Sequence, residues 1–146
     1  MRSARSFGIV LFARITSGMQ GSSAICVQVA PSVMSTVTSS APLTLPAHSS
    51  MFTGRFPPEH GVRDNGGFFL APEQVTLAEM FKERGFATGG FVAAFVLDRK
   101  WGISQGFDEY FDNFDISERR GRSMGNIQRP GNEVLDKALP WIDTVK

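Results

Sequence analysis

The sequence predicts an α/β fold in which helices cover both faces of a parallel sheet. Residues 86–96 form a continuous apolar stretch with a glycine break, which is typical of a buried strand. Helical patterns precede this stretch at residues 76–84 and follow it at residues 131–139. A buried strand between two helices is the pattern of layered α/β proteins.

The helix at residues 76–84 has the clearest boundaries. Thr76 and Glu79 have the spacing of a capping box, and Gly85 supplies a stop signal after the last turn. Its predicted apolar face consists of Leu77, Met80 and Phe81.

The later helix begins at Gly131, and Pro140 is expected to kink or end it, because proline has no N–H to donate to the helix. One apolar side is predicted for this helix, made of Val134, Leu135, Ala138, Leu139 and Ile142.

Aromatic and acidic side chains cluster after the predicted strand. The aromatic side chains are expected to pack in the core rather than to stack on a ligand: Trp101, Phe107, Tyr110, Phe111 and Phe114. The acidic side chains do not have the glycine and glutamate pattern of a calcium loop and are expected to form a solvated edge: Asp108, Glu109, Asp112 and Asp115.

Residues 44–54 contain the candidate reactive group. Pro46 suits the first turn of a helix, and Gly54 suits the position just past its end. The free N–H groups and the dipole of this helix would point toward Thr44, so its start is expected to bind a tetrahedral anion. Thr44 is therefore either an ordinary N-cap or a nucleophile toward a bound ester.

The segment 41–115 resembles the region around the nucleophile in the sulfatase and alkaline phosphatase superfamily. The sulfatase signature has its nucleophile, a proline and a basic residue where this chain has Thr44, Pro46 and His48. The signature closes its helix with a Thr-Gly pair, as residues 53–54 do here. This resemblance implies a partial three-layer α/β/α sandwich, and it continues through residues 54–66, 76–79, 84–86 and 102–108.

The residue types in this signature indicate phosphate chemistry more than classical sulfatase chemistry. Classical sulfatases oxidise a cysteine or serine to formylglycine, and a threonine cannot give that aldehyde. Thr44, His48 and Asn65 instead resemble the nucleotide pyrophosphatase/phosphodiesterase branch, in which a threonine attacks phosphorus and an asparagine binds a phosphoryl oxygen. Asn65 also lies in an Asp-Asn-Gly sequence, which favours a turn, and both roles are compatible.

The resemblance also implies a divalent metal, zinc or calcium, and a small anionic ester as substrate. A threonine hydroxyl is a poor nucleophile until a cation lowers its pKa, so Thr44 is also the predicted metal ligand. His48 stands where the signature has an arginine, and a histidine is charged only near or below neutral pH. The predicted catalytic residues are Thr44, Asn65 and His48.

Residues 1–40 form an atypical N-terminal segment, and residues 41–146 a partial sulfatase-like domain. The first segment contains no Asp or Glu, whereas the family usually takes its first metal ligands from an acidic strand end in this region. Three interpretations remain open for it: a wrong start site or reading frame, which we favour; a short secretory signal; and a divergent first strand with residues 7–12 as its core.

Other expected metal ligands are also missing from the sequence. His48 and His60 are the only histidines, and no Asp-His or His-x-x-x-His grouping is present. The sequence thus predicts a fragment of a metal-dependent hydrolase that contains the nucleophile and lacks most of the metal site. The alternative is a catalytically inactive remnant that at most binds an anion or a partner.

Composition excludes other classes of function. A net charge of +1 without a Lys/Arg run gives no reason to expect nucleic-acid binding, and no apolar run has the length of a membrane span. The single cysteine, Cys26, excludes an internal disulfide and does not indicate a cellular compartment.

Overall fold

The computed structural model describes residues 9–15, 25–26, 39–114 and 127–145, the first two ranges by their backbone alone. Within these residues the strands are β1 (Ile9–Ile15), β2 (Ile25–Cys26), β3 (Phe86–Val92) and β4 (Glu109–Phe111). The helices are α1 (Thr44–Thr53), α2 (Pro57–His60), α3 (Leu77–Glu83) and α4 (Gly131–Thr144). Two 3₁₀ turns, η1 (Phe95–Leu97) and η2 (Arg99–Trp101), follow β3.

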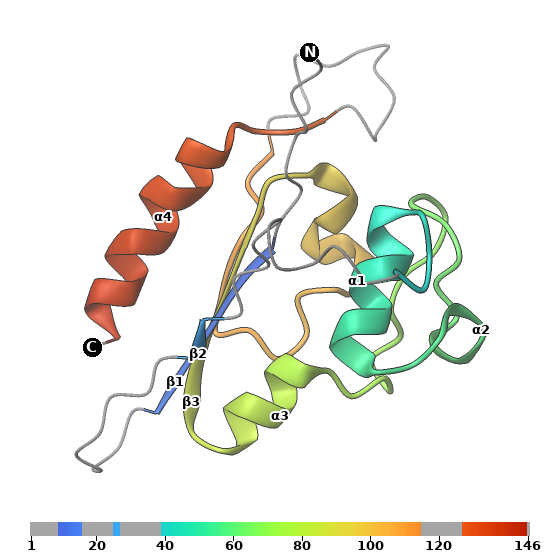
Figure 1. Ribbon diagram of the computed structural model, residues 1–146, viewed down its shortest axis with the longest axis horizontal. Coiled ribbons are helices and arrows are strands. Elements are labelled where there is room, and N and C mark those ends of the chain that lie inside the picture. The colour runs from blue at the N-terminus through green and yellow to red at the C-terminus, as the bar shows by residue number, and fades with distance from the viewer. Residues whose placement is uncertain (1–8, 16–24, 27–38, 115–126, 146) are drawn as a thin grey trace.

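The strands form one mixed sheet in the order β2-β1-β3-β4 (Figure 1). Strands β3 and β4 are parallel, with Gly90 opposite Tyr110. Strand β1 pairs antiparallel with β3, from Ile9 opposite Val92 to Ile15 opposite Phe86. Strand β1 overlaps residues 7–12, the segment that one interpretation reads as a divergent first strand. The division of the chain at residue 41 stays a prediction.

Helices cover both faces of this sheet, which confirms the predicted α/β fold. In contrast to the prediction, the sheet is not parallel throughout, because β1 runs antiparallel to β3. In Figure 1, α4 lies on one side of the strands and α1 and α3 lie on the other. Successive side chains of β3 alternate between these layers: Phe91 packs in a cluster with Val134 of α4, whereas Val92 belongs to the core that contains Leu45 of α1.

The glycine pair of β3 does not interrupt the strand, which pairs continuously with β1 through both positions. A Cβ on Gly89 would lie 2.9 Å from the Trp141 ring of α4, and a Cβ on Gly90 would lie 2.6 Å from the Tyr110 ring. Glycine is therefore needed here for close packing on both faces. The strand ends at Val92, shorter than predicted, because residues 95–97 turn into η1.

The predicted capping box of α3 is confirmed. The Thr76 hydroxyl accepts the Glu79 N–H at 3.2 Å, and a Glu79 carboxylate oxygen accepts the Thr76 N–H at 2.7 Å. Gly85 follows with φ of +80°, as a stop signal requires. The predicted apolar face is wrong at Met80, which is 43% exposed.

The structure corrects the predictions for α4. The helix continues past Pro140 to Thr144. Val134 and Ala138 form its buried side, whereas Leu135 and Leu139 are exposed, so the apolar side is narrower than predicted. None of the helices in the described ranges is long and apolar enough to cross a membrane.

The aromatic side chains after β3 pack in the core, as predicted. The Phe107 ring contacts the rings of Phe52 and Tyr110, and the Phe95 ring contacts those of Trp101 and Phe114. All of these rings except Phe95 belong to the core that contains Leu45 of α1, and Phe111 packs in the cluster with Val134 of α4.

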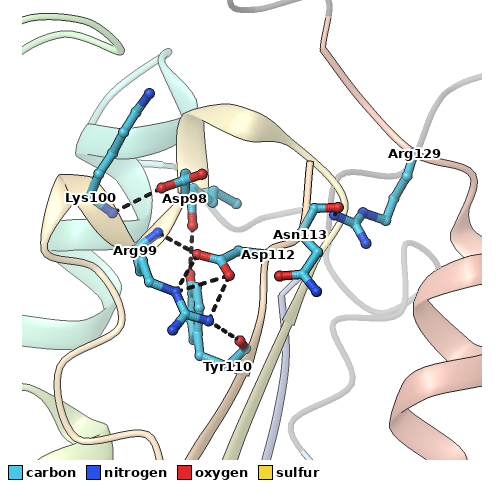
Figure 2. A network of polar contacts seen from close by, with 8 residues as sticks. Asp98, Arg99, Lys100, Tyr110, Asp112, Asn113 and Arg129 are labelled. Atoms are coloured by element: carbon cyan, nitrogen blue, oxygen red, sulfur yellow. Dashed lines mark hydrogen bonds and ion pairs between the residues drawn. The ribbon is translucent and has the colours of Figure 1, made fainter. Parts of the chain in front are cut away.

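The predicted solvated acidic edge is wrong at Asp112, whose side chain is buried and bound by Arg99 (Figure 2). Arg99 donates to both Asp112 oxygens from its side chain, at 2.8 to 3.0 Å, and to one of them from its backbone N–H, at 2.8 Å. A further Arg99 N–H bonds the Tyr110 carbonyl at 2.7 Å, so η2 is fixed to β4. Asp108 and Glu109 are exposed, and Asp115 lies outside the described residues.

Candidate active site

Thr44 is the first residue of α1. The N-cap position belongs to Leu43, whose side chain makes no capping hydrogen bond, so the structure does not give Thr44 the ordinary capping role. The helix ends as predicted at Gly54, which has a left-handed φ of +67°. Thr44 is half-buried, so it remains accessible at the start of the helix.

The Asn65 side chain lies at the same helix start. Its Oδ1 accepts the backbone N–H of Leu45 at 2.8 Å. Asn65 also lies in a bend, where its own N–H bonds the Asp64 carboxylate at 2.6 Å. The predicted bend at Asn65 is therefore present together with a contact to α1, whereas the binding of a phosphoryl oxygen by its amide stays a prediction. An amide that accepts through Oδ1 still has the two N–H donors of Nδ2.

The helix start offers fewer backbone donors than predicted. The Leu45 N–H is bound to Asn65, Pro46 has no N–H, and the Ala47 N–H makes the first bond of the helix, to the Leu43 carbonyl at 3.0 Å. The N–H groups of Leu43 and Thr44 are the remaining donors of this turn. The prediction that this helix start binds a tetrahedral anion therefore depends on these two donors together with nearby side chains, and it stays a prediction.

His48 lies one turn further along α1 and is directed back at Thr44. Its Nδ1 lies 2.7 Å from the Thr44 carbonyl oxygen. Because a carbonyl oxygen can only accept, Nδ1 carries the proton, and Nε2 of the neutral ring is an acceptor. Burial lowers the pKa of His48 by more than the bond to Thr44 raises it. His48 can donate to an anion through Nε2 only after protonation, which burial opposes.

A dedicated metal site is not formed by the residues that the structure describes. Among them, no group of three His, Cys, Asp or Glu side chains is arranged to hold a metal ion. Asp108 and Asp112 are already paired, with Lys82 and Arg99. The described donor set therefore does not fit the metal that the resemblance implies, apart from Thr44 as a single candidate ligand.

His60 and Ser50 form a contact near the site that the sequence did not indicate. Ser50 Oγ lies 2.9 Å from His60 Nε2, which joins α1 to the end of α2. The short helix α2 was not predicted either, although Pro57 and Pro58 followed by Gly61 are typical boundary signals.

These observations define a layered α/β protein whose predicted site residues meet at the start of one helix. A family model described as Sulfatase matches residues 29–144. The chain therefore belongs to the sulfatase family, whose members are hydrolases of sulfate esters in the alkaline phosphatase superfamily and typically use a divalent metal. Comparisons with curated proteins and with solved structures gave no significant match.

Proposed function

We propose that the protein is a hydrolase of sulfate or phosphate esters or diesters with Thr44 as its nucleophile. The observation that carries this proposal is the position of Asn65, whose bond to Leu45 places a carboxamide beside the residue that begins α1. Family membership supports ester hydrolysis over a catalytically inactive remnant. The threonine favours a phosphorus centre, because it cannot be oxidised to formylglycine.

In this proposal Thr44 and Asn65 have separate roles. The Thr44 oxygen forms a bond to phosphorus or sulfur while the bond to the ester oxygen breaks, and the departing alcohol takes up the proton that Thr44 loses. Water then hydrolyses the threonine ester, which releases the acid and restores the hydroxyl. The Nδ2 donors of Asn65 stabilise charge on a non-bridging oxygen, a contribution of about 3 kcal/mol in comparable sites.

His48 would hold the anion in its protonated form. Its Nδ1 proton is already bound to the Thr44 carbonyl, so only the Nε2 proton of a charged ring is available for the substrate. A bound anion would favour that charge by direct attraction. Zinc or calcium is the proposed cofactor, and among the described residues Thr44 is its single candidate ligand.

The test is hydrolysis of bis-p-nitrophenyl phosphate and p-nitrophenyl sulfate by the purified protein, with its zinc and calcium content measured. Thr44→Ala should abolish hydrolysis, whereas Thr53→Ala, the same substitution at the other end of α1, should leave it largely intact. Activity that persists in Thr44→Ala would exclude Thr44 as nucleophile. A folded protein that hydrolyses neither ester would favour the inactive remnant.

A further inference from the structure

The two nitrogens of the His60 ring have fixed and different roles. His60 is 2% exposed, and its Nδ1 lies 3.2 Å from the Val62 nitrogen. Because a backbone N–H can only donate, Nδ1 accepts, and the proton of the neutral ring is on Nε2. Nε2 therefore donates to Ser50 Oγ, 2.9 Å away. This tautomer cannot take a proton from Ser50, so the pair is not a catalytic Ser-His dyad.

The chain segment that follows His60 leads directly to the candidate site. Val62 is fully buried in the core that contains Leu45 of α1. Asn65, three residues later, accepts the Leu45 N–H. This segment is thus hydrogen-bonded to α1 at two points, through His60 to Ser50 and through Asn65 to Leu45.

Protonation of His60 would break one of its contacts. A proton on Nδ1 would face the Val62 N–H, so two donors would meet in a buried position where neither can bond water. Burial lowers the pKa of His60, while the nearby Glu59 carboxylate raises it by a smaller amount. The observed arrangement therefore requires the neutral ring.

We propose that His60 is a positioning residue: it holds the segment from Val62 to Asn65 against α1, so that the Asn65 carboxamide stays at the start of the helix. The importance of Asn65 for hydrolysis rests on the proposed function, whereas the role of His60 in holding this segment against α1 does not. When His60 is neutral, the segment is bound at both points. When His60 is protonated, the link through Val62 is lost and Asn65 is less firmly placed.

The tautomer and the backbone hydrogen bonds can be measured by NMR without any substrate. In the wild-type protein, ¹⁵N shifts of His60 should show protonated Nε2 and unprotonated Nδ1, and exchange of the Val62 and Leu45 amides should be slow. His60→Gln removes the acceptor at the Nδ1 position and should speed both exchanges about tenfold, the effect of one lost hydrogen bond. His60→Asn places an oxygen near that position and should restore the protection of Val62.

Two controls make the result specific. Met51→Ala alters an exposed side chain of the same helix and should change neither amide. The Glu79 amide, bound in the capping box of α3, reports whether each variant is folded.

A wild-type ring protonated on Nδ1 would overturn the proposal, as would unchanged Leu45 exchange in a folded His60→Gln. Absence of hydrolysis with both NMR results as expected would overturn the proposed function alone.

Discussion

The side-chain oxygen of Asn65 lies 2.8 Å from the backbone nitrogen of Leu45 and joins two segments that are 20 residues apart. This bond satisfies one of the N–H groups that a helix start leaves unpaired. It also fixes the orientation of the amide, because Oδ1 is occupied and Nδ2 is the end that can donate to a substrate. Asn65 thus combines a structural role at α1 with a proposed catalytic one.

Substitutions at Asn65 should separate these two roles. Asn65→Ala removes the bond to Leu45 and should lower the free energy of unfolding by about 1 kcal/mol. Asn65→Asp keeps an acceptor, and its negative charge suits a helix start, so stability should be retained. Both variants lose the Nδ2 donors and should reduce kcat/KM by about 10²-fold to 10³-fold. Urea unfolding and hydrolysis of bis-p-nitrophenyl phosphate measure the two effects, and full activity in Asn65→Asp would exclude the donor role.

Loss of Arg99 should destabilise the protein through Asp112. Arg99 is largely exposed, but it neutralises a carboxylate whose side chain is only 5% exposed (Figure 2). Arg99→Met should therefore cost about 2 kcal/mol of unfolding free energy, since an unpaired buried charge is left behind. The double variant Arg99→Met/Asp112→Asn should lose less than the sum of the single losses. Additive losses would show that the two side chains are not coupled.

Stability should fall as the pH decreases through the histidine range. Burial lowers the pKa of both His48 and His60 in the folded protein, below the ordinary value of 6.5. The unfolded chain therefore takes up protons first, and stability is lost as the pH falls from about 6.5 toward the lower folded values. Urea unfolding at about pH 7.5 and about pH 5.5 measures this loss, and His60→Gln or His48→Gln should each reduce it.

A carboxylate variant provides the control for this pH dependence. Burial raises the pKa of Asp108, but the ion pair with Lys82 and bonds from Thr88 lower it overall, below 3.8. The contribution of the Asp108 carboxylate to the free energy of unfolding is present above its ordinary pKa of 3.8 and is lost only as the pH falls through the lower pKa of the folded protein. Asp108→Asn should therefore leave the loss between about pH 7.5 and about pH 5.5 unchanged. An equal reduction in this variant would contradict the assignment to the histidines.

The sequence predicted those elements whose boundaries depend on local chemistry. The Thr76–Glu79 capping box and the left-handed Gly54 and Gly85 are set by neighbouring residues, and the structure has them where the sequence indicated. The meeting of Asn65 with the start of α1 was expected only from resemblance, because no local pattern specifies a contact across 20 residues.

Predictions that depended on tertiary packing were less accurate. Asp112 is buried because Arg99 from η2 reaches it, and the acidic composition of its surroundings gave no sign of this. The backbone donors of α1 appeared free because the acceptor on Asn65 belongs to a distant segment. In each case the deciding partner comes from another element, so periodicity and spacing within one segment could not reveal it.

Substitution of the two glycines of β3 by alanine should destabilise the protein by different amounts, because the two added Cβ atoms lie on opposite faces of the sheet. A Cβ at Gly90 would come within 2.6 Å of Tyr110, which is held by a bond of 2.7 Å from its hydroxyl to the Leu97 carbonyl. Gly90→Ala should therefore lower the free energy of unfolding by about 2 to 3 kcal/mol, as overpacking does.

Gly89→Ala should cost less than Gly90→Ala. The added Cβ would meet the half-buried Trp141 ring at 2.9 Å, and that ring lies in the last turns of α4, where it can shift. Gly131→Ala is the matched control, because a Cβ there has no atom within 4 Å. Urea unfolding should rank the losses as Gly90, then Gly89, then Gly131. An equal loss at the two strand positions would mean that both faces of β3 are packed with the same rigidity.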